Sequence, residues 1–590
     1  MKYPMLYSKD SSRQVVDAFK GYNHNLRIGD GEFFDMKNMT SDYYPVLAPR
    51  KKRGIYKNGV SATGLIAKNF LCYVDGSDFV YGSDRIEMGL TKAPKELVSM
   101  GAYVIILPDR KYINTIKNDN GEYEFGNIDE EYTTIKPVSF SLCTITGDAY
   151  YEEGKEPPKH DMAPESPENG DLWIDTSSTP HTLKKFSKDQ DMWVSIATTY
   201  IKIYSVGLSE RFKQYDGIKL SGITVEGLTD LNAAHVVWES GKDYIVIKGI
   251  LDKVAIQEPD QGKITFSRKM PNMDIVVEAN NRLWGCRYGT DENGAVVNEI
   301  YASKLGDFKN WNCFMGVSTD SWVGQCGTDG LFTGAITHRG YPLFFKENCV
   351  HKVYGDYPAN FRFQNTECRG VQQGCGQSLA IVNETVFYKS RNAVCAYDGS
   401  LPVEISSALG DIQYDYATGC AFGNKYYINM RDAEGICHLF VYDTEKGVWH
   451  KEDGIEELWQ LCTFRGDLYG IDYETGNIIT MLGSGSQYEY NVPWMIETGL
   501  IGMSMPDMKY ISKMMIRMSL ETDASVDVSI QYDSMENWEH VCNISATSLR
   551  TFSVPIRLRR CDHFRIRIEG NGDGRIYSIT KTIEQGSDVS

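Results

Sequence analysis

The stretch ETVFYKSRNAVCAYDG, residues 384–399, decides the fold. It contains two runs rich in β-branched and aromatic residues, 385–388 and 394–397, and polar turn residues follow each run. Runs of about four or five residues are too short for a helix and have the length of a strand. The stretch therefore predicts two short strands separated by a turn.

The same pattern recurs towards the end of the chain. Its copies begin near residues 340, 384, 424 and 466, so they lie about 40–44 residues apart, the length of a four-stranded propeller blade. A four-stranded sheet of this length cannot bury both faces alone, and such repeats acquire a core by packing face to face around an axis. The repeat therefore predicts an all-β fold built on a β-propeller.

Similar strand pairs upstream extend the expected ring. They lie near residues 66–82, 100–115, 201–220 and 240–266. At about 40–50 residues a blade, the chain would form roughly seven or eight blades. We therefore expect the propeller to span residues 60–482, with residues 1–60 joining or closing it.

Two segments interrupt this pattern. Residues 150–195 have a Pro-rich beginning followed by three short strand-like runs, which indicates a small inserted β module. After Gly483–Ser486 the chain alternates apolar and polar residues again, and this predicts a C-terminal antiparallel β-sandwich over 490–590. Because Gly-Ser segments are flexible, we expect the sandwich to be separable by a cut near Ser484.

Composition and charge exclude several classes of protein. The 590 residues include 61 Lys and Arg against 79 Asp and Glu, a net charge of −18 that disfavours binding to a nucleic-acid backbone. No apolar run is long enough for a signal peptide or a membrane anchor. The 14 cysteines contain no Cys-x-x-Cys pair, so we interpret them as reduced core residues of a protein made in a cytoplasm.

The sequence offers no recognisable catalytic motif. Phosphate loops, zinc-hydrolase motifs and serine-hydrolase elbows are absent, and the ten histidines form no local cluster. Acidic pairs such as Asp30 with Glu32, or Asp411 with Asp415, would suit glycoside hydrolysis only if the fold gathered them, and turn aspartates more often bind local backbone. We therefore expect no catalytic residue, no cofactor and no metal site.

Two groups of residues are candidates for binding. Trp173 and Trp193 in the inserted module could stack on a glycan, or they could form the miniature core of that module. Arg557, Arg559, Arg565 and Arg567 alternate with apolar residues, which predicts one polar face of paired strands. That face is either simply solvated or a docking surface for an acidic partner.

Several stretches resemble the propellers of tailed-bacteriophage and prophage virion proteins. They are Asn281–Gly285, Glu299–Ser303, Asn310–Asn312, Tyr341–Asn348 and Tyr388–Gly399. The run Asn169–Asp175 with Trp193–Val194 is similar to a short module of phage tail and fibre proteins, and the sandwich resembles their accessory domains.

The resemblance implies a structural virion protein of the tail or neck, of the nozzle, hub or packaged-DNA-stabilising type. Its partners would be other virion proteins and copies of itself in a ring around the DNA exit path, with no specific DNA binding and no membrane anchor. It would be assembled in the cytoplasm of a host bacterium. Two alternatives stay open: a receptor-binding or glycan-binding adsorption protein of the tail, and a glycan-cleaving propeller enzyme.

Overall fold

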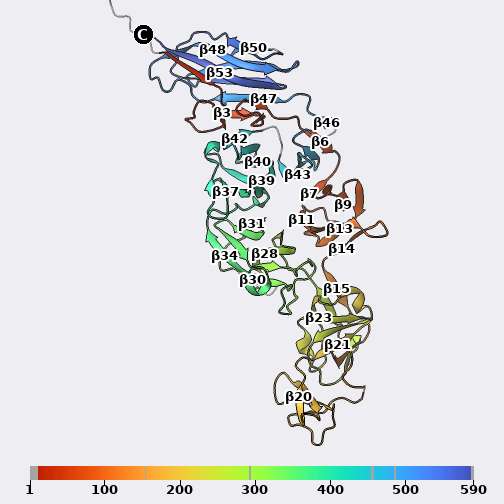
Figure 1. Cartoon of the computed structure of the whole chain (residues 1–590). Helices are drawn as coiled ribbons and strands as arrows, with labels where there is room; N and C mark the ends of the chain where they lie inside the picture. Colours follow the sequence, from red (N-terminus) through yellow and green to blue (C-terminus); the bar gives the residue numbers. More distant parts are fainter. Residues whose placement is uncertain are drawn as a thin grey trace, which may run out of the picture.

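The computed structural model describes residues 11–152, 154–291, 294–452, 457–483, 487–545 and 547–586. The molecule is elongated, with a β-sandwich at one end, a β-propeller in the middle and an inserted barrel with a small sheet at the other end (Figure 1). The predicted all-β fold is confirmed. Among the described residues no helix is long and apolar enough to cross a membrane. The short helices are α1 (Leu208–Arg211), η1 (Thr229–Leu231), η2 (Pro259–Gln261), η3 (Pro358–Asn360), η4 (Gly376–Ser378) and η5 (Ser407–Leu409).

The propeller has seven blades, within the predicted range of seven to eight. In the first six, strands that are neighbours in sequence are also neighbours in the sheet. The first three blades consist of β7 (Ala62–Ala67), β8 (Leu71–Asp75), β9 (Asp78–Tyr81) and β10 (Asp84–Glu87); β11 (Glu96–Met100), β12 (Tyr103–Leu107), β13 (Lys111–Lys117) and β14 (Tyr123–Asn127); and β27 (Ile275–Ala279), β28 (Arg282–Thr290), β29 (Val296–Ala302) and β30 (Trp322–Gln325). The next three consist of β31 (Phe332–His338), β32 (Tyr341–Lys346), β33 (Cys349–Tyr354) and β34 (Arg362–Glu367); β35 (Ala380–Val382), β36 (Thr385–Lys389), β37 (Val394–Tyr397) and β38 (Val403–Glu404); and β39 (Tyr414–Phe422), β40 (Lys425–Asp432), β41 (Cys437–Asp443) and β42 (Val448–Lys451).

The seventh blade closes the ring with a strand from the N-terminal segment. Its strands are β43 (Leu458–Phe464), β44 (Asp467–Asp472), β45 (Ile478–Thr480), β6 (Gly54–Lys57) and β46 (Gln487–Tyr488). Ile55 of β6 lies opposite Ile479 of β45, and the innermost strand β43 contacts β7 of the first blade. The two ends of the propeller are therefore joined by backbone hydrogen bonds within one sheet.

A separate barrel is inserted between the second and third blades, and this corrects one prediction. Strands near 201–220 and 240–266 belong to this barrel and not to the propeller, because they pair with one another and with residues 130–143. Residues 130–143 run beside residues 255–268, with Glu130 opposite Arg268 and Val138 opposite Gln257, so the eight-stranded sheet closes on itself. The barrel strands are β15 (Glu130–Thr133), β16 (Val138–Cys143), β21 (Tyr200–Tyr204), β22 (Gly217–Ser221), β23 (Ala234–Gly241), β24 (Tyr244–Lys248), β25 (Ala255–Gln257) and β26 (Thr265–Arg268).

The small module lies inside this barrel domain, between β16 and β21. It is a four-stranded sheet of β17 (Lys159–His160), β18 (Leu172–Asp175), β19 (Thr182–Ser187) and β20 (Met192–Ser195). Figure 1 places β20 at the tip of the molecule farthest from the sandwich. The module is therefore an insertion within an insertion.

The sandwich contains strands from both ends of the chain, so its predicted limits of 490–590 need correction. One sheet consists of β1 (Ser11–Val16), β53 (Gly574–Gln585), β48 (Lys509–Leu520) and β51 (Arg550–Val554). The other consists of β2 (Gly21–Tyr22), β3 (Glu32–Lys37), β47 (Pro493–Thr498), β52 (Phe564–Asn571), β49 (Ser525–Tyr532) and β50 (Glu539–Ile544). The hairpin of β4 (Met39–Thr40) and β5 (Ala48–Pro49) then leads to the propeller.

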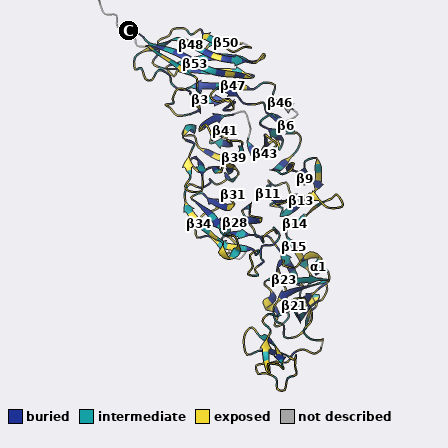
Figure 2. Ribbon diagram, viewed as in Figure 1, coloured by how far each residue is buried: buried dark blue, intermediate teal, exposed yellow. Residues whose placement is uncertain are grey.

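The sandwich and the propeller share a hydrophobic core. Tyr22 packs against Phe440 of the sixth blade, with ring centroids 5.5 Å apart. A Cβ atom at Gly21, which has φ +82°, would lie 2.2 Å from the carbonyl oxygen of Trp449, so only glycine fits there. The proposed joint at Ser484–Ser486 lies outside the described residues, but these contacts argue against a separable sandwich. Figure 2 shows the buried residues concentrated in the strands, whereas β20 at the far tip is largely exposed.

Candidate functional site

A large hollow lies between the innermost strands of the propeller, around its axis. It has a volume of about 1000 Å³ and is lined by residues of all seven innermost strands, β7, β11, β27, β31, β35, β39 and β43. This is the size of a small-molecule site, since ligand pockets measure about 300–1,000 Å³.

Acidic side chains give this channel its charge. Glu96, Asp274 and Glu278 line it, and among its described lining residues there is no Lys or Arg. Asp274 accepts a hydrogen bond from the amide of Tyr288 at 2.9 Å. Burial raises the pKa of Glu96 to about 7, although its carboxylate accepts a hydrogen bond from the backbone of Val276. Such a channel repels phosphate groups.

Buried polar contacts join the blades that surround the channel. The side-chain oxygen of Gln460 accepts from the amide of Leu65, and its side-chain nitrogen donates to the carbonyl of Lys95, both at 2.9 Å. These bonds join the seventh blade to the first blade and to the start of the second. The ammonium of Lys95 forms a buried ion pair with Asp109. The described residues contain no group of three or more side chains suited to a metal ion.

The acidic pairs considered from the sequence are not gathered at the axis. Asp30 belongs to the sandwich and pairs with Lys581 at 2.6 Å, and Glu32 accepts from the amide of Gly29 at 2.6 Å. Asp415 forms an ion pair of 3.1 Å with Arg431 at the edge of the sixth blade. The carboxylates of Asp30, Glu32 and Asp415 are thus each bound to a partner away from the channel.

The four arginines do not form one face, which corrects the predicted alternation. Arg565 and Arg567 do lie together on β52, and both bind the carboxylate of Glu497 on β47, at 3.0 and 2.8 Å. Arg557 and Arg559 lie in the irregular stretch 555–560 before β52, where the strand pattern has ended. Because these two residues are not in a strand, their alternation with apolar residues does not place them on one face.

Aromatic rings cover parts of these guanidinium groups. Arg567 lies 4.0 Å from the ring centroid of Trp538, and Arg559 lies 4.8 Å from that of Tyr532. Arg559 also forms an ion pair with Glu539. Of the predicted docking residues, Arg557 and Arg559 are exposed, whereas Arg565 and Arg567 are half-buried and neutralise Glu497.

The two tryptophans of the small module contact each other. Trp173 is 4% exposed, its indole N–H donates to the carbonyl of His160 at 3.1 Å, and Lys184 covers its ring at 4.9 Å. Trp193 packs edge-on against it with centroids 5.5 Å apart. Trp173 is thus a core residue of the module. Trp193 is half-buried and is the residue of this pair that a glycan could reach.

Sequence reasoning missed Glu96 and a cavity in the sandwich that contains Asp30 and Lys581. Glu96 is the first residue of β11. In the sequence, a charged residue before an apolar run has the pattern of a strand end that faces solvent, so nothing marked Glu96 as a channel residue. Asp30 and Lys581 come from opposite ends of the chain, so no local motif could join them.

Neither a protein-family model nor a curated protein matches this chain. Solved structures with a similar arrangement include BamB from Moraxella catarrhalis, at 10% identity and TM-score 0.33, covering 75% of this chain and 99% of that one. They also include exo-β-1,3-galactanase from Phanerochaete chrysosporium, at 9% identity and TM-score 0.21, covering 52% of this chain and 94% of that one. A third is the acylaminoacyl peptidase of Pyrococcus horikoshii, at 10% identity and TM-score 0.26, covering 75% and 58%. No function is transferred from likenesses at this level.

Proposed function

We propose that this chain is a structural component of the tail or neck of a phage particle. It assembles through contacts with other virion proteins and with copies of itself into a ring around the DNA exit path. The observation that carries the proposal is the serial arrangement of domains, with the sandwich and the inserted module at opposite ends of the propeller (Figure 1). Such a molecule can contact different neighbours at its two ends.

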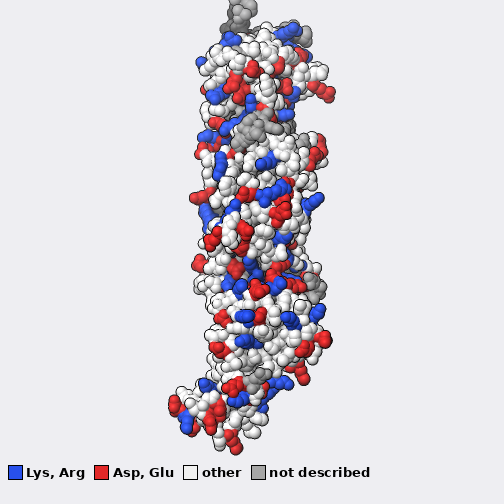
Figure 3. Space-filling model, turned by 90° about the vertical axis from the view of Figure 1, so that its right-hand side faces the viewer, with Lys and Arg blue, Asp and Glu red and all other residues white. Residues whose placement is uncertain are grey.

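The charge distribution supports this role. The net charge is −18, and the axial channel is lined by carboxylates. On the face shown in Figure 3, acidic and basic side chains are interspersed along the length of the molecule. A ring built from such subunits would have no extended basic surface there to hold DNA, which favours sliding over binding.

Purified particles test the proposal. The chain should be present in several copies per particle, and electron microscopy of particles with a tagged chain should place the tag at the tail or neck. Particles from a host that lacks the gene should fail to retain or eject DNA, and the wild-type gene should restore them. Absence of the chain from infectious particles would refute the structural role.

A second candidate, a receptor-binding adsorption protein, is favoured by one observation. Trp193 lies on the module at the far tip, where Met192 and Val194 of the same strand are 53% and 41% exposed. In this role the purified chain alone should bind host cells, and Trp193→Ala should abolish that binding. Met162→Ala, which removes another exposed apolar side chain of the module, is the matched control.

We also propose that the chain is not an enzyme. The purified protein should release no sugar from host surface glycan or peptidoglycan. Reproducible release that is lost on Glu96→Gln, with the fold intact, would favour the glycan-cleaving alternative.

A further inference from the structure

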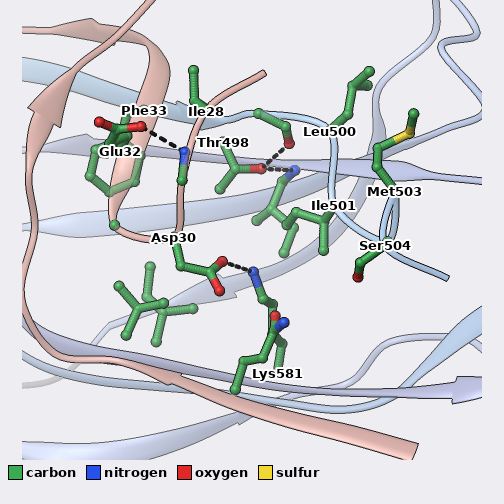
Figure 4. Close-up of a pocket in the computed structure, with 18 of the residues that line it drawn as sticks. Ile28, Asp30, Glu32, Phe33, Thr498, Leu500, Ile501, Met503, Ser504 and Lys581 are labelled. Carbon is green, nitrogen blue, oxygen red and sulfur yellow. Dashed lines mark hydrogen bonds and ion pairs between the residues drawn. The ribbon is translucent and has the colours of Figure 1, made fainter. Parts of the chain in front are cut away.

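A cavity of about 240 Å³ opens in the sandwich and is lined by residues of both sheets (Figure 4). Its walls come from the two ends of the chain, from residues 14–33 and from residues 498–504, 566, 579 and 581. Pockets for drug-sized ligands measure about 300–1,000 Å³, so this one has room for a single small ring.

The polar part of the wall contains an ion pair and a free acceptor. Lys581 donates to the carboxylate of Asp30 at 2.6 Å, and the side chain of Lys581 is only 7% exposed (Figure 4). Gln14 lies directly opposite Lys581 across the β1–β53 pair, so both side chains lie on the same face of the sheet. The side-chain oxygen of Gln14 is buried and has no hydrogen-bond partner among the described residues. A buried acceptor without a partner destabilises the protein, and a bound donor would satisfy it.

Another part of the wall is apolar, beside the polar side chains of Glu32, Thr498 and Ser504. Phe33, Leu500 and Met503 contribute side chains to it (Figure 4). Two glycines allow the loops around the cavity to pack closely against neighbouring segments. A Cβ atom at Gly31, with φ +90°, would lie 2.4 Å from the carbonyl oxygen of Ala18. A Cβ atom at Gly499 would lie 2.4 Å from the side chain of Ile28. The loops are therefore positioned by the protein itself, before any ligand binds.

We propose that this cavity binds one sugar ring of a saccharide, through two neighbouring hydroxyl groups. A hydroxyl both donates and accepts hydrogen bonds, so a vicinal diol matches an adjacent carboxylate and ammonium, and the oxygen of Gln14 accepts from a further hydroxyl. The C–H face of the ring would lie against the apolar wall. This inference goes beyond the proposed function, because it holds whether or not the chain belongs to a particle.

Other ligand classes fit this wall less well. A wholly apolar ligand would remove water from the Asp30–Lys581 pair without replacing its hydrogen bonds. A charged ligand would place a like charge beside one member of the pair. A neutral polyol does neither, since it leaves the ion pair intact.

Saturation-transfer NMR with the full-length protein tests this site. The probes are glucose, galactose, mannose, rhamnose and trans-1,2-cyclohexanediol, with cyclohexanol, p-cresol and L-leucine as comparisons. We expect at least one saccharide and the diol to bind in the millimolar range, about −4 kcal/mol, and cyclohexanol to bind several-fold more weakly. Lys581→Met and Gln14→Met should each weaken saccharide binding by about tenfold, as expected for the loss of a buried hydrogen bond.

The matched control is Lys513→Met on the neighbouring strand β48, whose side chain is exposed and should not matter. Trp193→Ala should also leave this binding unchanged, which separates the cavity from the module at the tip. If Lys581→Met does not fold, the saccharide binding of Gln14→Met, a variant on the edge strand β1, tests the proposal. The proposal is overturned if no saccharide binds at about 20 mM, or if p-cresol or leucine binds more tightly than every saccharide.

Discussion

Arg50 and Glu489 form a bidentate ion pair, with N–O distances of 2.7 and 2.9 Å. The pair joins the two chain segments that connect the sandwich to the propeller. Arg50 lies where the chain leaves the sandwich for the seventh blade, and Glu489 lies where it returns. The same carboxylate accepts from the amide of Arg53 at 2.9 Å. One residue pair therefore fixes both connections, although its members are 439 positions apart.

Removal of this carboxylate should destabilise the protein. Glu489→Gln leaves the guanidinium of Arg50, whose side chain is 3% exposed, without its charge partner. Because Glu489 itself is one-third exposed, we expect a loss of about 2 kcal/mol, below the 3–5 kcal/mol of fully buried pairs. Thermal unfolding followed by circular dichroism measures it. Glu474→Gln, at an exposed site, should leave the melting temperature unchanged.

The same pair predicts a pH dependence. Burial raises the pKa of Glu489, but the hydrogen bonds from Arg50 and Arg53 outweigh it, so the pKa lies below its ordinary value of 4.5. A carboxyl with a lowered pKa stabilises the fold above pH 4.5, and this contribution is lost as the pH falls through the folded-state pKa. The stability difference between wild type and Glu489→Gln should accordingly shrink below about pH 4.5. A difference that grows on acidification would contradict this assignment.

The closure of the propeller depends on Gln460. Gln460→Leu would leave the amide of Leu65 and the carbonyl of Lys95 buried without partners, at a cost of about 1–3 kcal/mol each. Hydrogen exchange should then speed up in β7 and β43 more than in the sandwich. Gln364→Leu on the outer strand β34 removes an exposed amide and should not change these rates. Equal exchange in both variants would show that closure does not need this contact.

Glu96 should make the protein less stable as the pH rises. Its folded-state pKa of about 7 lies above the ordinary value of 4.5, because burial penalises the charged form. The contribution of Glu96 to the free energy of unfolding is therefore largest below pH 4.5 and is lost as the pH rises through about 7. Glu96→Gln should be more stable than wild type at pH 8, by about 2 kcal/mol, and the gain should vanish near pH 4. Glu87→Gln at an exposed strand end is the control.

The sandwich should not fold without the N-terminal strands. A fragment of residues 490–590 lacks β1 and β3, which pair with β53 and β47 in the intact protein. We expect this fragment to be insoluble, and a fusion that adds residues 11–40 to improve its solubility. A soluble, cooperatively unfolding 490–590 fragment would show that the N-terminal strands are dispensable.

The blades could be predicted from the sequence because their pairings are local. In the fifth blade, residues 385–389 pair with 394–397, so the turn between them and the apolar runs are visible in one short stretch. The barrel strands have the same local pattern, which is why 201–220 and 240–266 resembled blades. Their identity depends on pairings such as Glu130 with Arg268, which no local signal reveals.

The same reasoning explains what was missed at the sites. Trp173 and Trp193 were recognised as a possible core because a small module must bury its large side chains. The N-terminal strand β1 pairs with β53 more than 500 residues later, so neither the true sandwich nor its cavity could be foreseen. Arg557 and Arg559 show the opposite error, since an alternating pattern alone does not make a strand.

The two halves of the arginine cluster should respond differently to charge reversal. Arg565→Glu with Arg567→Glu places two carboxylates beside Glu497, whose side chain is 7% exposed, so the fold should be destabilised by several kcal/mol. Arg557→Glu with Arg559→Glu lies in an exposed, irregular stretch and should spare the fold, at a cost of about 0–1 kcal/mol. If this stretch docks an acidic partner, the second variant should fold normally by circular dichroism yet enter particles less efficiently, because reversed rim charges slow association. Normal incorporation of a normally folded variant would make Arg557 and Arg559 solvated residues and direct the search for the interface to the propeller loops.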